Sequence, residues 1–251
     1  FSYYTGGAPG SGNLLMKTGD EEFKQIGNPD YLYGWAWKTD ADGEGGSGSD
    51  DVYLSGDELF ILAFHGPFKG PATTGIHKVN INTRETTRVI EEEVVGFRAD
   101  GDYLYYQTKG TFCRYSLKDG RKEAIKQVAA EDNAIMDYQI LNGRIYWQKA
   151  AKDRYDPDLG ELNEGIFNID GKNLNEGAML DGMRLIGVGN DYLGCTFKET
   201  DTSKYRIMVF DRNGSVVFKT SDTAGGSIHI DKNNIYFYNA TTGTVCIGEL
   251  K

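Results

Sequence analysis

The sequence has few cysteines and prolines, and both shortages exclude classes of protein. Its 251 residues contain 3 Cys and 5 Pro. Cys113, Cys195 and Cys246 are far apart and odd in number, which excludes a small secreted domain held together by disulfides. Each cysteine lies in an apolar stretch, so we expect buried and unreactive thiols. With so little proline and no Gly-X-Y period, the chain is not collagen-like.

Long apolar runs and a positive net charge are also missing. No apolar run approaches the roughly 20 residues of a membrane-spanning helix, so we expect no membrane insertion within this chain. The formal net charge is −10. A negative field repels phosphate groups, so we expect no nucleic-acid partner. The chain begins at Phe1 without Met or an apolar leader. We therefore expect a processed protein, with any export signal outside this sequence.

Glycine and aromatic residues, by contrast, are abundant. The chain has 33 Gly, roughly twice the usual frequency of about 7%. Phe, Trp and Tyr together make up 12% of the residues, and aromatic residues favour the pleated surface of a strand. No segment shows a sustained helical period. These features predict an all-β protein of many short strands joined by glycine-containing turns.

One motif recurs along the chain. A polar turn containing Gly, Asp or Asn is followed by Leu or Ile and then usually by an aromatic residue. The spacing between successive aliphatic residues of the motif is 45, 41, 48 and 42 residues. This period matches the roughly 40–50 residues of one four-stranded propeller blade. The aliphatic residues of the motif are Leu59, Leu104, Ile145, Leu193 and Ile235.

A second pattern completes the repeating unit. Alternating strands end in turns at Asp119-Gly120, Asp170-Gly171 and Asn213-Gly214, and such dipeptides are the strongest short-range signal of a β-hairpin. Each unit is therefore a four-stranded antiparallel meander that must stack on its neighbours. The two termini add three strands each, which predicts one six-bladed β-propeller domain unless the chain is part of a larger ring. The approximate blades are 1–27, 28–93, 94–130, 131–180, 181–222 and 223–251.

Three of these strands resemble a known repeat. Leu104 to Gln107, Ile145 to Gln148 and Ile235 to Tyr238 are similar to a degenerate Tyr-Trp-Thr-Asp motif. The chain thus resembles a bacterial propeller family related to the six-bladed propellers of low-density-lipoprotein-receptor type. The Thr-Asp half of the motif is missing, so no ligand site of those propellers is transferred to this sequence. The resemblance implies the architecture and a location outside the cell or on its surface.

One acidic segment resembles a calcium loop. Between residues 40 and 51, carboxylates occupy positions 1, 3, 5 and 12 and glycine occupies position 6, the pattern by which oxygen ligands surround Ca²⁺. Position 12 is Asp rather than the longer Glu. No helices flank the segment, so an acidic surface loop without metal is the alternative. The candidate metal ligands are Asp40, Asp42, Glu44 and Asp51.

Four further residues are candidates for ligand contact. Trp35 and Trp37 alternate onto one face of a strand and could stack on a sugar ring, although propeller aromatics are more often buried. His65 lies in a segment rich in Gly and Pro that we expect to form a loop. Tyr155 lies in an insertion over residues 149–163, which is either a partner-binding loop on the rim or an ordinary variable loop.

No catalytic residues are predicted. The three histidines, His65, His77 and His229, lack metal-ligand spacing, and the sequence contains neither a Gly-x-Ser-x-Gly elbow nor a phosphate-binding loop. We therefore predict a non-enzymatic binding or scaffolding propeller that engages a protein, peptide or glycan through rim loops or its channel. The alternative is a glycan-active hydrolase or lyase with carboxylates at the channel mouth, because fold alone does not decide function.

Overall fold

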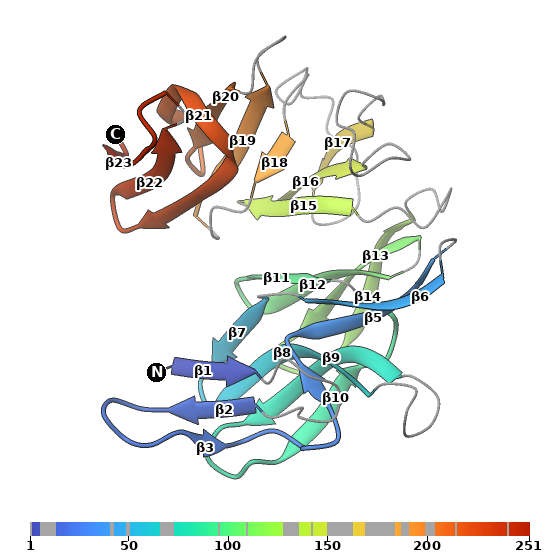
Figure 1. Cartoon of the computed structure of the whole chain (residues 1–251). Helices are drawn as coiled ribbons and strands as arrows, with labels where there is room; N and C mark the ends of the chain where they lie inside the picture. The colour runs from blue at the N-terminus through green and yellow to red at the C-terminus, as the bar shows by residue number, and fades with distance from the viewer. Residues whose placement is uncertain are drawn as a thin grey trace. The chain divides into compact units, whose positions relative to one another are not determined.

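Every regular element of the computed structural model is a β-strand, and all strand pairs are antiparallel (Figure 1). The all-β prediction is thus confirmed, and none of the described residues forms a helix suited to crossing a membrane. The chain divides into two units, Phe1–Asn133 and Ala134–Lys251, which are described separately. The structure describes residues 2–5, 14–40, 43–48, 51–65, 73–94, 96–108, 110–127, 136–141, 143–149, 163–168, 184–186, 191–198, 204–213, 215–239 and 241–251.

The described residues of the first unit form three sheets and one separate hairpin. In the central sheet, β8 pairs with β9 on one side, and β9 pairs with β10. The other edge of β8 pairs with β7 near the start of β8 and with β4 near its end. Two strands share this edge because the hairpin β5–β6 is inserted between β4 and β7. The strands of the first sheet are β1 (Ser2–Thr5), β2 (Leu14–Lys17) and β3 (Lys24–Gln25). Those of the central sheet are β4 (Leu32–Tyr33), β7 (Val52–Ser55), β8 (Glu58–His65), β9 (Thr73–Asn80) and β10 (Thr86–Ile90). The hairpin is β5 (Trp35–Asp40) and β6 (Gly43–Gly48), and the third sheet is β11 (Phe97–Asp100), β12 (Tyr103–Thr108), β13 (Thr111–Ser116) and β14 (Lys122–Gln127).

Where the structure describes the second unit, it forms a three-stranded sheet and a six-stranded one. The long strand β21 belongs to two consecutive meanders, because it pairs with β20 along its first part and with β22 along its last part. A register shift between Thr223 and Ile228 separates the two parts. The strands of the first sheet are β15 (Met136–Leu141), β16 (Arg144–Lys149) and β17 (Asn163–Asn168). Those of the second are β18 (Arg184–Ile186), β19 (Leu193–Lys198), β20 (Lys204–Phe210), β21 (Val216–Asp231), β22 (Asn234–Asn239) and β23 (Thr244–Glu249).

The recurring aliphatic residues form the centres of these meanders. Each lies in the second strand of its meander, and each has an exposed fraction of 0%. Burying one such side chain contributes about 1.5–3 kcal/mol, which explains why this position repeats when its neighbours vary. The five residues are Leu59 in β8, Leu104 in β12, Ile145 in β16, Leu193 in β19 and Ile235 in β22.

The central sheet of the first unit is covered on both faces. Leu59 and Ile61 pack with Leu14 of the first sheet, whereas Phe60 packs with Phe97 of the third sheet. Because successive side chains of a strand point to opposite faces, β8 must be apolar along its whole length. This explains its continuous run of six buried residues, Leu59 to Phe64.

Two segments differ from the predictions. His65 is the last residue of β8 rather than part of a loop, because the doubly covered apolar strand continues up to it. Half of the segment 40–51, which was expected to be a loop, is strand β6, hydrogen-bonded to β5. Its glycines leave the backbone free to pair closely with β5. Of the three cysteines, all free, Cys195 is buried and the other two are half-buried.

Candidate functional site

The structure places one of the four predicted metal ligands, Asp51, away from the hairpin tip that carries Asp40. In the β5–β6 hairpin, Asp40 pairs with Gly43 at the tip and Trp35 pairs with Gly48 at the base, while Asp51 lies beyond the base. At about 3.3 Å per strand residue, the tip and the base are about 16 Å apart. Calcium ligands surround one ion at about 2.3–2.6 Å. Asp51 therefore does not join Asp40 at one ion.

The tip of the hairpin remains a predicted calcium site. Asp42 lies outside the described residues, as do the side chains of Asp40 and Glu44. Within the described part of the chain, no three His, Cys, Asp or Glu side chains come together as metal ligands would. Calcium binding at the tip is thus still a prediction that rests on the sequence.

Asp51 instead connects the central and third sheets of the first unit. Its Oδ2 accepts a hydrogen bond of 2.9 Å from the backbone N–H of Phe97, and its Oδ1 forms an ion pair with Arg98. It lies just before β7, and the two partners begin β11. The carboxylate therefore fixes the starts of two strands that are 46 residues apart in the sequence.

Replacing Asp51 tests this connection. Asp51→Ala is expected to lower the free energy of unfolding by about 2 kcal/mol, because the Phe97 N–H loses its partner. Asp51→Asn is expected to cost about half as much, since its amide oxygen still accepts that bond and the partly exposed ion pair contributes about 1 kcal/mol or less. Urea denaturation measures both, with the exposed turn variant Asp102→Ala as a control within about 0.5 kcal/mol of the parent. Equal costs for the Ala and Asn variants would contradict the hydrogen-bonding role.

The predicted ligand-contact residues do not form one site in the described structure. Trp35 is half-buried in β5. His65 is also half-buried, and its ring packs edge-to-face with the Tyr31 ring, with the two ring centroids 6.1 Å apart. The side chain of Trp37 and the whole of Tyr155 lie outside the described residues. Ligand contact at all four residues remains a prediction.

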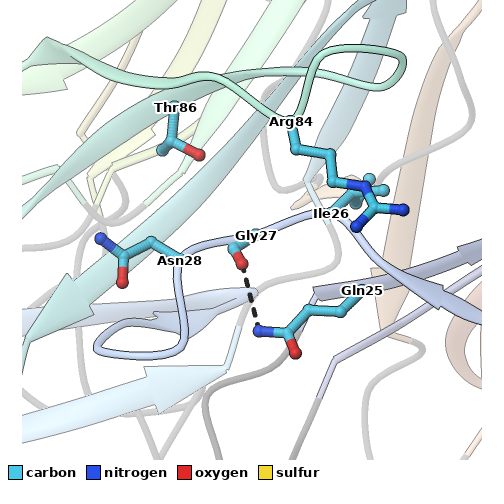
Figure 2. Close-up of a pocket in the computed structure, with 6 residues that line it drawn as sticks. All are labelled: Gln25, Ile26, Gly27, Asn28, Arg84 and Thr86. Atoms are coloured by element: carbon cyan, nitrogen blue, oxygen red, sulfur yellow. Dashed lines mark hydrogen bonds between the residues drawn. The ribbon is translucent and has the colours of Figure 1, made fainter.

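A pocket of about 380 Å³ lies elsewhere in the first unit. One wall is the end of β3 and the segment that follows it, and the opposite wall is the turn between β9 and β10 with the start of β10 (Figure 2). This volume lies within the roughly 300–1,000 Å³ of small-molecule sites. The residues that line it are Gln25, Ile26, Gly27, Asn28, Arg84 and Thr86.

Backbone hydrogen bonds hold the first wall against the first sheet. The N–H groups of Ile26 and Gly27 donate to the carbonyl of Leu14 at 2.9 and 3.3 Å. The N–H of Asn28 donates to the hydroxyl of Tyr33 at 2.9 Å. A Cβ atom on Gly27 would lie 2.5 Å from the Tyr33 ring, so no side chain fits there. Burial raises the pKa of Tyr33, which remains a neutral phenol.

The second wall is the tight five-residue turn from Asn80 to Arg84. The carbonyl of Asn80 accepts a bond of 2.9 Å from the N–H of Arg84, and the side-chain oxygen of Asn80 caps the N–H groups of Asn82 and Thr83 at 3.0 and 2.9 Å. Arg84 has a φ of 66°, a left-handed conformation that is uncommon for a residue with a side chain. The turn thus holds an exposed guanidinium at the pocket (Figure 2).

A buried aromatic cluster adjoins Tyr33. The centroid of the His77 ring lies 4.5 Å from that of Tyr31 and 5.8 Å from that of Tyr33, in edge-to-face contact with both. Only 2% of His77 is exposed, and neither ring nitrogen has a hydrogen-bond partner. Burial, with a smaller contribution from the Arg88 cation, lowers the pKa of His77 to about 4. The ring is therefore neutral at physiological pH.

Sequence reasoning did not identify the pocket residues. Gln25 ends the short strand β3 and Asn28 lies in the irregular segment after it, neither within a motif. The pocket forms only when two segments distant in sequence come together. One signal was present for Arg84, because the same turn in the third sheet has Gly120 at the equivalent position. An arginine where the turn favours glycine is a local inconsistency that can be read from the sequence.

Comparisons with known proteins identify the fold. No family model and no curated protein matches the sequence. The chain is similar to the β-propeller domain of the Trilobed protease from Pyrococcus furiosus, with 12% identity and a TM-score of 0.56 over 99% of this chain and 84% of that one. It is also similar to Porphyromonas gingivalis dipeptidyl peptidase 4, with 7% identity and a TM-score of 0.56 over 98% and 43% of the two chains. Pyrococcus horikoshii acylaminoacyl peptidase has 10% identity and a TM-score of 0.51 over 75% and 42%. At these identities the similarity is evidence of fold alone, and the fold is that of a β-propeller.

Proposed function

We propose that the protein is a non-enzymatic binding propeller. The observation that carries the proposal is the chemistry of the pocket between β3 and β10. Its exposed side chains carry two amides, from Gln25 and Asn28, and the guanidinium of Arg84. These groups form hydrogen bonds, but none of them exchanges a proton near neutral pH. Such a lining favours recognition of a polar ligand over acid–base catalysis.

Hydrolysis of a glycan would need a different lining. Glycoside hydrolases use two carboxyl groups about 5–10 Å apart. No Asp or Glu lines the described pocket, so the pocket gives the hydrolase or lyase alternative no support. A peptide, a protein surface or a glycan can each present groups that suit these amides and this guanidinium.

The proposal includes the form of the propeller. Six groups of strands support six blades: β1–β3, β7–β10, β11–β14, β15–β17, β18–β21 and β21–β23. Together with the resemblance to bacterial YWTD-like propellers, this supports a closed six-bladed ring that acts outside the cell or on its surface. A compact single domain of 251 residues should have a radius of gyration of about 18 Å by small-angle scattering. A clearly larger value would contradict ring closure.

A binding screen tests the proposed function. The purified chain is applied to glycan and peptide arrays, and every hit is confirmed by calorimetry and by incubation for several hours with product analysis. We expect saturable binding and unchanged ligand. Cleavage of a bound ligand would favour the enzyme alternative, and the absence of any saturable ligand would contradict the binding proposal.

A further inference from the structure

The turn that carries Arg84 has two close equivalents among the turns that the structure describes. In each, the first residue accepts a backbone bond of 2.9 Å from the residue four positions later, which is left-handed. The three left-handed residues are Arg84 (φ 66°), Gly120 (φ 72°) and Gly243 (φ 67°). The equivalents are the turns between β13 and β14 and between β22 and β23. Glycine occupies this position twice, and arginine occupies it once.

An arginine at this position costs stability, so its presence suggests a role. L-residues other than Asn and Asp rarely adopt the left-handed conformation, whereas glycine adopts it freely. Strain of this kind concentrates at binding sites, where a side chain must be held in place. Of the three turns, the one with arginine is the one that lines the pocket.

The amide side chains of Gln25 and Asn28 each form one hydrogen bond within the protein, and the remaining amide atoms are available to a ligand. The amide nitrogen of Gln25 donates to the carbonyl of Gly27 at 3.3 Å, so its oxygen is left as an acceptor (Figure 2). The side-chain oxygen of Asn28 accepts from the Asp30 N–H at 2.9 Å, which leaves its NH₂ group as a donor. The guanidinium of Arg84 takes part in no ion pair or hydrogen bond within the described residues.

These groups fit one ligand chemistry. A guanidinium recognises a carboxylate through two parallel hydrogen bonds. The free amide donor and acceptor suit neighbouring hydroxyl groups, which both donate and accept. The single apolar side chain of the lining, Ile26, is only 3% exposed, so the pocket offers little surface to the side chain of a peptide.

We infer that Arg84 makes this pocket a binding site for the carboxylate of an acidic sugar. The inference rests on the proposed binding function and specifies its ligand class. The protein carries a formal net charge of −10, so its overall field repels anions. Selectivity for an acidic sugar over a neutral one must therefore come from the local contact with Arg84.

Replacing Arg84 separates this role from stability. Arg84→Gly is expected to weaken binding of glucuronic acid at least tenfold in calorimetry, while raising Tm by about 2–4 °C because strain is removed. Arg84→Lys keeps the charge but not the planar fork, and should bind with intermediate affinity. The reverse exchange, Gly120→Arg, is the matched control: it should lower Tm and leave glucuronic acid binding unchanged.

The comparison of ligands decides the inference. The parent chain should bind glucuronic acid at least tenfold more tightly than glucose. Equal affinity for the two sugars, unchanged binding by Arg84→Gly, or selective binding of an acidic peptide instead of the sugar would each overturn the acidic-sugar site and leave the proposed binding function standing. A parent chain that binds no glycan or peptide at all overturns both.

Discussion

Gly75→Ala is expected to lower the free energy of unfolding by about 4 kcal/mol or more. Gly75 lies in β9 with a φ of 150°, a conformation that residues with a side chain avoid. A Cβ atom there would lie 1.9 Å from the carbonyl oxygen of Ile90 on the neighbouring strand β10. That oxygen belongs to the backbone, so it cannot move without displacing the strand. Conformational strain and overpacking therefore add at one position.

Nearby hydrogen bonds resist such a displacement. The register of β9 and β10 shifts between Arg88 and Ile90. Across this irregularity, the Arg88 guanidinium donates two bonds to the carbonyl of Thr74, at 3.1 and 2.6 Å. Moving Ile90 away from a new side chain at position 75 would disturb these bonds. The cost should consequently appear as a loss of stability and not as a small local adjustment.

Gly101→Ala is the matched control for this variant. Gly101 also has a positive φ, 57°, but no atom lies within 4 Å of a Cβ built on it. Its replacement should cost about 1–2 kcal/mol, from backbone conformation alone. Urea denaturation of both variants gives the two free energies of unfolding. If Gly75→Ala cost no more than Gly101→Ala, the predicted clash with Ile90 would be wrong.

The regular part of the fold could be predicted from the sequence. Leu59 and Leu104 occupy the same position of the repeat, and both are buried. An apolar residue that recurs at a fixed period indicates a buried position, so these residues identify the meanders. The insertion after β4 could not be predicted in this way. β6 is mainly Gly and Ser, without apolar alternation, so its strand depends on pairing with β5 and not on its own residues.

The candidate site was less predictable than the fold. The sequence predicts site residues mainly from acidic and aromatic side chains. In the structure one of them, Asp51, instead accepts a hydrogen bond from the backbone of Phe97. The pocket uses Gln25 and Asn28, which are ordinary surface residue types. Their significance comes from the approach of β3 to the β9–β10 turn, a contact across some 60 residues of chain that no local pattern encodes.

Acidification should destabilise the protein through His77. In the folded state burial lowers the pKa of this residue to about 4, whereas in the unfolded chain it returns to about 6.5. Above pH 6.5 both states are neutral at this ring and its contribution to stability is complete. Between pH 6.5 and 4 only the unfolded chain takes up a proton, so stability falls as the pH decreases. Each pH unit between the two pKa values is worth about 1.4 kcal/mol, which gives a loss of about 3 kcal/mol by pH 4.

The environment of His77 explains why a proton is excluded. The cation of Arg88 lies opposite it on β10, and the rings of Tyr31 and Tyr33 enclose it without accepting a hydrogen bond from either nitrogen. His77→Leu retains an apolar side chain of similar size, so the variant should fold at neutral pH and should lose about 3 kcal/mol less than the parent between pH 6.5 and 4. The exposed His229 is the matched position, and His229→Gln should retain the parental pH dependence. Free energies of unfolding by urea at pH 7.5, 6, 5 and 4 provide the measurement. Parallel pH profiles of the parent and His77→Leu would mean that acid instability arises elsewhere and that a buried His77 accepts its proton at little cost.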